Sequence, residues 1–241
     1  MNGEIKKLRE FVELSDNIVF FGGAGVSTES GIPDFRSKDG LYSMKYKYPP
    51  ETIISRSFFM YQTEEFFKFY REKMIFRDAA PNPAHTALAR LEEAGKLKAV
   101  VTQNVDGLHQ MAGSKNVVEL HGSIHRNFCM DCRKPYPLEY VLGSDPVPTC
   151  TCGGIVKPDV VLFEEQLDSE VIESAVRHIA QADMLIVGGT SLVVYPAAAF
   201  IDFYEGNRLV LINMSKTSRD YMANLVVAGK IGEVLPYVTP A

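Results

Sequence analysis

The sequence lacks the features that would place the protein in a membrane, on a nucleic acid or outside the cell. Its longest apolar runs have the length of a strand, far below the roughly 20 residues that a helix needs to cross a bilayer. It has no excess of positive charge, since its formal net charge is -5. We therefore expect no nucleic-acid partner and no attraction to anionic membranes. The first residues, MNGEIKKLREFVEL, also lack the continuous apolar stretch of a secretory signal, so we expect a cytoplasmic protein.

Cysteine is scarce too, with 4 residues in 241. In a reducing compartment these thiols are expected to be ligands rather than disulfides. They form two close pairs, Cys129 with Cys132 and Cys150 with Cys152, and four thiolates can surround a zinc ion at about 2.3 Å. We predict one structural Zn2+ in a small zinc-ribbon-like module at 124–158, which has little core of its own. The C-x-C spacing of the second pair is unusually tight, and four reduced or redox-active thiols are the alternative.

The rest of the chain alternates short apolar strands with helices. Strands are expected at 18–21, 98–102, 184–187 and 208–213, and helices at 4–15, 82–95, 168–181 and after Pro196. This alternation predicts an α/β fold, a Rossmann-like parallel sheet with helices on both faces. The sheet domain would comprise 1–123 and 159–241. Hydrophobic residues make up 46% of the chain, enough for a sizeable core.

The glycine-rich segment GGAGVSTES (22–30) follows the first expected strand. Backbone N–H groups and a helix N-terminus at such a point can bind a pyrophosphate. The segment lacks the third glycine of the G-x-G-x-x-G fingerprint, so a simple strand-to-helix turn remains possible. The continuation favours nucleotide binding, because Phe35 offers a flat apolar wall and Arg36 can pair with phosphate oxygens.

Successive segments of the chain resemble the signature blocks of the sirtuins of bacterial type, in the same order and with similar spacing. They are GAGVSTESGIPDFR (23–36), TQNVDGLH (102–109), ELHGS (119–123), the paired cysteines, KPDVVLFEE (157–165) and GTSLVVYPAA (189–198). The resemblance covers nearly the whole chain. It implies a Rossmann-type domain and a small zinc domain, with NAD and an acyl-lysine peptide meeting in the cleft between them.

The activity that the resemblance implies is NAD-dependent protein-lysine deacetylation. The acyl group moves from lysine to ADP-ribose, and nicotinamide and O-acetyl-ADP-ribose are released. A mono-ADP-ribosyltransferase is the alternative, because it begins by breaking the same nicotinamide bond. An NAD sensor or zinc scaffold without catalysis is a further one.

The resemblance also assigns residues to NAD. Those that match positions at its phosphates and adenosine are Ala24, Thr28, Arg36, Thr190, Ser191, Asn213 and, more weakly, Ile231. Those that match positions at its nicotinamide end are Phe35, Gln103, Asn104, Val105 and Asp106. Asn213 also ends an apolar strand, where ligands bind beyond the carboxyl ends of parallel strands.

His121 matches the catalytic base of the family, and an imidazole suits the removal of a ribose hydroxyl proton near neutral pH. The other histidines are His85, His109, His125 and His178. His85 and His178 lie in helical patterns and are expected at the surface or in helix caps. By resemblance, His109 orients structure more than it does chemistry.

Two departures from the family concern the substrate. The block that usually ends F-G-E reads Phe163-Glu164-Glu165 here, which places an acid beside the channel where an extended peptide is expected and could favour basic peptides. Phe67 and Tyr70 occupy the positions of the Tyr and Arg that mark the desuccinylating branch. Without that cation we expect neutral acyl groups, although Arg71 lies next in the chain.

Overall fold

A parallel sheet forms the centre of the larger part of the molecule. The computed structural model describes residues 2–35, 37, 40, 41 and 46–239, and within them six parallel strands pair in the order β3-β2-β1-β7-β8-β9. Their bounds are β1 (Ile18–Gly22), β2 (Leu97–Thr102), β3 (Val117–Glu119), β7 (Met184–Gly188), β8 (Leu209–Asn213) and β9 (Leu225–Ala228). This is the doubly wound order of Rossmann folds, whose winding reverses between β1 and β7. The predicted fold class is confirmed.

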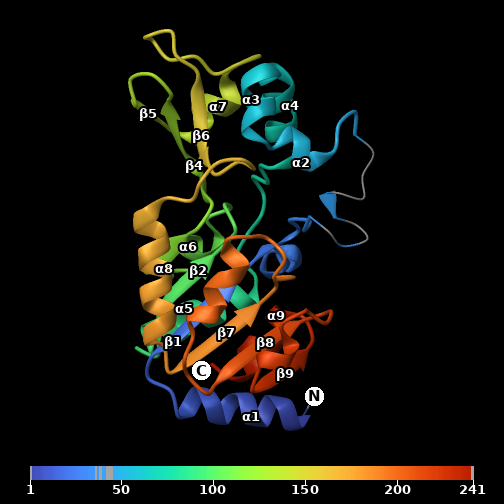
Figure 1. Cartoon of the computed structure of the whole chain (residues 1–241), viewed down its shortest axis with the longest axis vertical. Helices are drawn as coiled ribbons and strands as arrows, with labels where there is room; N and C mark the ends of the chain where they lie inside the picture. Colours follow the sequence, from blue (N-terminus) through green and yellow to red (C-terminus); the bar gives the residue numbers. More distant parts are fainter. Residues whose placement is uncertain (1, 36, 38–39, 42–45, 240–241) are drawn as a thin grey trace.

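Helices cover both faces of this sheet (Figure 1). One face is covered by α1 (Asn2–Glu13), α5 (Pro83–Glu93) and α9 (Ile231–Val234), and the other by α8 (Ser169–Gln181) and the 3-10 helix η4 (Ala197–Phe203). Strand β1 contributes Phe20 to the first core and Phe21 to the second, as the two-residue period of a strand requires. The central strands are therefore apolar along their whole length.

The strands and helices expected from the sequence are found, with their ends shifted by one or two residues. The helix expected after Pro196 is also found, as the 3-10 helix η4. Strands β3 and β9 were not predicted, since each has only three or four residues. Across the described ranges, no helix combines the length and apolar character needed to span a membrane.

A second, antiparallel sheet lies beyond the parallel one, at the top of Figure 1. It has the order β5-β4-β6, and a group of short helices lies beside it. These elements are β4 (Gly122–Cys129), β5 (Pro135–Tyr136), β6 (Val156–Val160), α2 (Pro50–Ile53), α3 (Arg56–Tyr61), α4 (Thr63–Lys73) and α7 (Leu138–Gly143). The short helix α6 (Leu108–Met111) contacts α5 and belongs to the larger part. The aromatic rings of α3 and α4 share one apolar core with β4, β6 and α7.

That shared core explains how a small sheet is stabilised. Phe59 and Phe66 meet edge to face at 4.9 Å between ring centroids, and Phe67 meets Phe66 at 5.3 Å. Cys129 and Cys150 are buried in the same cluster. The cysteine-bearing segment thus buries its apolar side chains together with helices that come much earlier in the chain. The domain boundaries at 124 and 158 stay a prediction.

The start of α5 is tied to the glycine-rich segment. Asn82 caps the helix: its Oδ1 accepts a hydrogen bond from the Ala84 N–H at 2.9 Å, while its own N–H donates to Nδ1 of His85 at 3.2 Å. Its Nδ2 donates to the Val26 carbonyl at 2.7 Å and to Ser30 Oγ at 3.0 Å. One buried side chain therefore fixes both the helix and the loop after β1.

We predict that Asn82→Ala lowers the free energy of unfolding by about 2–4 kcal/mol. Loss of an N-cap costs about 1 kcal/mol, and the buried Val26 carbonyl loses its partner at a further cost of about 1–3 kcal/mol. Urea unfolding measures the loss. Asn207→Ala, at an exposed asparagine, is the control and should change stability by less than about 0.5 kcal/mol. Equal losses in the two variants would contradict this role of Asn82.

Candidate active site

A cavity of about 840 Å³ lies at the carboxyl edge of the parallel sheet, a volume typical of ligand pockets. It extends to the small antiparallel sheet, because Ile124 and Val160 of that sheet also line it, together with Leu138 at the start of α7. The site residues predicted from the sequence that line it are Ala24, Thr28, Phe35, Gln103, Asn104, Val105, Asp106, His121, Thr190, Ser191, Asn213 and Ile231. Arg36 lies outside the described residues. The fold thus brings the separate sequence segments to one place.

The loop after β1 forms two 3-10 turns, η1 (Ala24–Val26) and η2 (Thr28–Ser30), and the expected α-helix N-terminus is absent from this described segment. The Gly25 N–H donates to the Gly189 carbonyl at 2.8 Å, and a Cβ on Gly25 would lie 2.8 Å from Gly189 Cα. Gly189 itself has a left-handed φ of 60°, which favours glycine. The third glycine of the fingerprint serves helix packing against the strand. Because the described segment forms no α-helix here, the chain does not need a third glycine for such packing.

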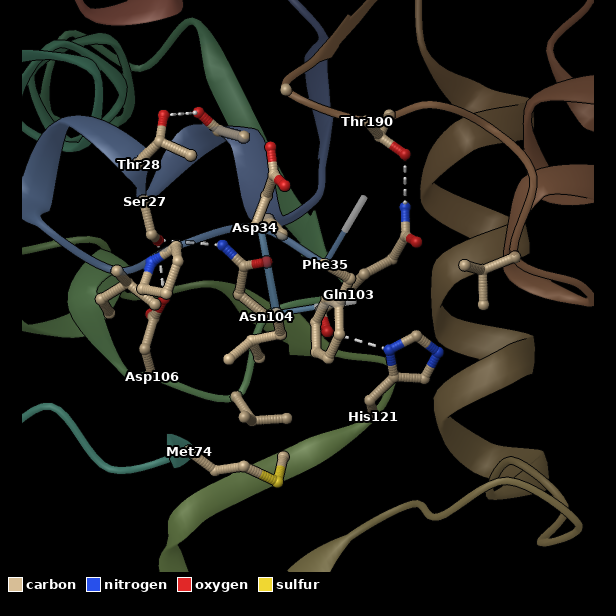
Figure 2. Close-up of a pocket in the computed structure, with 18 of the residues that line it drawn as sticks. Ser27, Thr28, Asp34, Phe35, Met74, Gln103, Asn104, Asp106, His121 and Thr190 are labelled. Carbon is tan, nitrogen blue, oxygen red and sulfur yellow. Dashed lines mark hydrogen bonds between the residues drawn. The ribbon is translucent and has the colours of Figure 1, made fainter. Parts of the chain in front are cut away.

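Ser27 joins two of the predicted residues. Asn104 Nδ2 donates to Ser27 Oγ at 3.0 Å, and Ser27 Oγ donates to Asp106 Oδ2 at 2.6 Å, as Figure 2 shows. The other carboxylate oxygen of Asp106 accepts from the Leu108 N–H at 2.9 Å. Ser27 is only 1% exposed. Sequence reasoning missed this residue, although it lies within the glycine-rich segment that carried the first signal.

A second set of hydrogen bonds connects the ends of three strands. Gln103 Nε2 donates to Thr190 Oγ1 at 3.1 Å (Figure 2). The Thr190 N–H donates to Asn213 Oδ1 at 3.0 Å. These residues follow β2, follow β7 and end β8, respectively. The bonds cross the point where the winding of the sheet reverses, and they fix the side chains that face the cavity there.

His121 lies between β3 and β4, with Nδ1 at 2.9 Å from the Gln103 carbonyl oxygen (Figure 2). Because a carbonyl only accepts, Nδ1 carries the hydrogen and Nε2 keeps its lone pair. Burial lowers the pKa of His121 below the ordinary 6.5, and the bond to Gln103 opposes this shift. The imidazole is therefore neutral at pH 7, with Nε2 as its basic atom.

The remaining histidines differ in their surroundings. His85 and His109 are buried behind the cavity with ring centroids 4.7 Å apart, and burial lowers their pKa values to about 4 and about 3. His85 is a capping residue, as expected, but it is not at the surface. His125 Nε2 lies 3.0 Å from the Asp106 carbonyl oxygen, and His178 lies in the last turn of α8.

The residues expected to determine which acyl group is accepted do not lie at the cavity. Phe67 and Tyr70 are fully buried in the core beside the small sheet, outside the lining of the cavity. Arg71 donates to the carbonyls of Val141, Ser144 and Pro146, so it does not face the cavity. The cavity is instead lined near this helix by Lys73, Met74 and Arg77. The preference for neutral acyl groups stays a prediction.

The four cysteines form a compact set of sulfur ligands, with all four Sγ atoms within 4.8 Å of one another. Cys129 and Cys152 are 3.4 Å apart at Sγ, and Cys132 and Cys150 are 3.6 Å apart. A tetrahedral zinc with Zn–S bonds of about 2.3 Å requires sulfur separations of about 3.8 Å, so the set fits this metal. Four sulfurs leave no open position on zinc. The site is therefore suited to a structural role.

The comparison with known proteins decides the family. The model of the Sir2 family matches residues 23–196, which is more than half of the chain. The chain belongs to the Sir2 family. A relative from Clostridium acetobutylicum named NAD-dependent protein deacetylase is 62% identical to this Sir2 chain over 239 residues, 98% of each chain.

Solved Sir2 structures share the whole fold. One, described as showing the mechanism and regulation of Sir2 enzymes, has a TM-score of 0.90 and 43% identity, and the match covers 99% of this chain and 97% of that one. Another, described as Sir2 with a p53 peptide and NAD+, has a TM-score of 0.87 and 40% identity, with 97% and 96% covered. Members of this family use NAD+ as co-substrate.

We predict about one zinc ion per chain, needed for the folding of the small sheet. Cys132→Ser should lose the metal and lower the melting temperature, because structural zinc contributes directly to folding. Elemental analysis and thermal unfolding with and without a chelator test this. Thr151→Ala, at an exposed position between two of the ligands, should keep the metal. Protein purified without chelators that contains no metal would show the prediction to be wrong.

Proposed function

We propose that this Sir2 protein is an NAD-dependent protein-lysine deacetylase. It transfers the acetyl group of an acetyl-lysine to the ADP-ribose part of NAD, consumes one water, and releases nicotinamide, free lysine and O-acetyl-ADP-ribose. NAD supplies the electrophilic sugar carbon and the leaving group. The observation that carries the proposal is the orientation of His121: among the described residues its basic Nε2 has no hydrogen-bond partner, and it shares the cavity with Asn104 and Asp106. The identity of 62% with a named deacetylase supports it.

The adenosine and phosphates of NAD are proposed to lie at the carboxyl edge of the sheet. The position agrees with the rule that ligands of doubly wound sheets bind where the winding reverses. The backbone of the glycine-rich loop faces the phosphates there. The side chains proposed to hold this half of NAD are Ala24, Thr28, Arg36, Thr190, Ser191, Asn213 and Ile231.

The nicotinamide end is proposed to lie over Asn104 and Asp106. Ser27 and the Leu108 N–H hold the Asp106 carboxylate in place, so it is oriented to accept a hydrogen bond from the nicotinamide amide, beside Val105. Gln103 and Asn104 are proposed to bind the adjoining ribose. Phe35, an apolar wall of the same cavity, would exclude water from the reacting sugar and so limit wasteful hydrolysis.

His121 is proposed to be the general base. Its Nε2 takes the proton of a ribose hydroxyl, while Nδ1–H stays bonded to the Gln103 carbonyl. That bond fixes the tautomer before any substrate arrives. It also strengthens when the ring becomes positively charged, because a charged donor makes a stronger hydrogen bond. One backbone carbonyl therefore orients the base and stabilises its protonated form.

The protein substrate is proposed to lie as an extended strand between the segment at 157–165 and the facing loop at 189–198. Phe163 and Tyr195 line the cavity from these two sides and are 39% and 65% exposed. Backbone pairing would provide most of the affinity, as in other strand-addition complexes. The proposed partners are proteins or peptides that carry acyl-lysine. The preference for a neutral acyl group is proposed from the sequence resemblance alone. We also propose a cytoplasmic location, where the four thiols stay reduced, and expect no nucleic-acid partner at a net charge of -5.

We predict that His121→Ala and Asp106→Ala separate two steps. Loss of the base should slow deacetylation by about 10²–10⁴-fold, while NAD affinity and the exchange of labelled nicotinamide into NAD fall much less. Asp106→Ala should reduce exchange and deacetylation together. Mass spectrometry of an acetyl-lysine peptide, run beside the exchange assay, gives both rates.

His178→Ala, in the last turn of α8 and outside the cavity lining, is the matched control and should keep both rates. Near-normal deacetylation by His121→Ala would remove this residue as the base. Accumulation of protein-bound ADP-ribose in place of free lysine would instead identify a mono-ADP-ribosyltransferase.

We predict that the acid limb of the pH profile lies below pH 6.5. The pKa of His121 is lowered from 6.5, so the neutral, basic form predominates at pH 6.5 and is lost only as the pH falls through the lowered value. Because kcat/KM reports the free enzyme, it should decline as the pH falls through the lowered pKa, with a midpoint below 6.5. A midpoint above pH 6.5 in the measured kcat/KM would contradict the burial of a neutral base.

A further inference from the structure

A second groove, of about 480 Å³, lies beside the main cavity. Phe163 and Glu164 line both, so this strip is the wall that the two share. The other residues that line the groove are Glu51, Thr52, Ser55, Ser57, Phe58, Tyr61 and Gln62. The described lining of the groove thus contains two carboxylates and no lysine or arginine.

The carboxylate of Glu164 is held in one place. Its Oε2 accepts hydrogen bonds from the Ser57 N–H, at 2.8 Å, and from the Ser57 hydroxyl. These bonds lower the pKa of Glu164, so the side chain is ionised at neutral pH. The backbone of Glu164 has a φ of 75°, a left-handed conformation that costs a non-glycine residue about 1–2 kcal/mol. At this position a glycine would adopt the backbone conformation with less strain than the glutamate does.

The neighbouring acid differs, because its charge is compensated. Glu165 accepts hydrogen bonds from Arg56 and from Lys157, each at 3.0 Å, and from the Leu162 N–H at 2.8 Å. Among the described residues, Glu164 has no cationic partner. Glu164 therefore presents an uncompensated negative charge at the shared wall.

The backbones of Phe163 and Glu164 differ in whether their hydrogen-bonding groups are available to a peptide. The backbone of Phe163 is already paired with the segment that joins α2 to α3: its N–H donates to the Ile54 carbonyl at 3.0 Å, and its C=O accepts from the Arg56 N–H at 2.9 Å. Within the described ranges, the N–H and C=O of Glu164 have no hydrogen-bond partner. A peptide that pairs with this strip would carry its flanking side chains past Glu164.

We propose that Glu164 is a specificity-determining residue that favours substrates with a lysine or arginine side chain close to the acyl-lysine. The inference rests on the proposed deacetylase function. The cation would lie in the second groove, where it meets the Glu164 carboxylate and the ring of Tyr61, which is 84% exposed. A cation over such a ring is attracted by its electron-rich face. An acidic side chain at the same place is repelled.

The test compares acetyl-lysine peptides that differ at one flanking position, with arginine, alanine or glutamate placed at each position in turn. For the wild-type protein, kcat/KM should favour arginine over glutamate by about tenfold at one or more positions. Exposed ion pairs are worth up to about 1 kcal/mol, and repulsion of the acid adds to the ratio. The preference should appear in KM rather than kcat and should shrink at high salt.

Glu164→Gln keeps the shape of the side chain and should bring the ratio close to one. Glu164→Gly, which also relieves the left-handed backbone, should do the same in a protein at least as stable. Glu13→Gln removes a charge at the end of α1, far from the groove (Figure 1), and should keep the ratio. A tenfold preference that persists in Glu164→Gln would overturn the inference.

The same peptide assays distinguish a wrong role of Glu164 from a wrong deacetylase function. Equal kcat/KM values for all peptides would overturn the role of Glu164 and leave the deacetylase function standing. Absence of deacetylation with every peptide, in protein that binds NAD, would overturn the proposed function and the role of Glu164 with it.

Discussion

The close approach of two backbones at Gly25 and Gly189 is the constraint on which the cavity depends. Strands β1 and β7 lie side by side and end at Gly22 and Gly188, and their loops then leave toward opposite faces of the sheet. The Gly25 N–H meets the Gly189 carbonyl before the loops diverge. A side chain at either position would push the loops apart, and the crevice between them would lose its shape.

Beyond this contact, three of the residues proposed to act in the site are held by a group from a different segment. The Gln103 carbonyl orients His121, Ser27 orients Asp106, and Asn213 positions the Thr190 backbone. These bonds exist in the protein alone, so the polar groups need little rearrangement when a ligand binds. Such preorganisation is a main source of catalytic power in enzymes.

The sequence predicts the apolar strands, because burial on both faces leaves continuous runs such as IVFF, and it predicts the zinc ligands, because thiols in close pairs have few other uses. It does not reveal Ser27, since a single serine among glycines shows no periodicity. Nor does it reveal that helices at 50–73 share a core with the cysteine segment, because that contact joins residues far apart in the chain. The two 3-10 turns after β1 were unpredictable for a related reason: the segment that replaces a helix there is fixed by its contact with Gly189.

The strand order also determines when the protein becomes able to bind a ligand during its synthesis. Strand β1 leaves the ribosome first, but its neighbour β7 is among the last elements made, and β8 and α9 follow it. Until β7 has been made, the edge of β1 that pairs with it in the folded protein has no partner strand. Contacts of such long range form slowly. A nucleotide held at this edge could stabilise the sheet only after β7 and β8 have been made, because Thr190 and Asn213 line the cavity there.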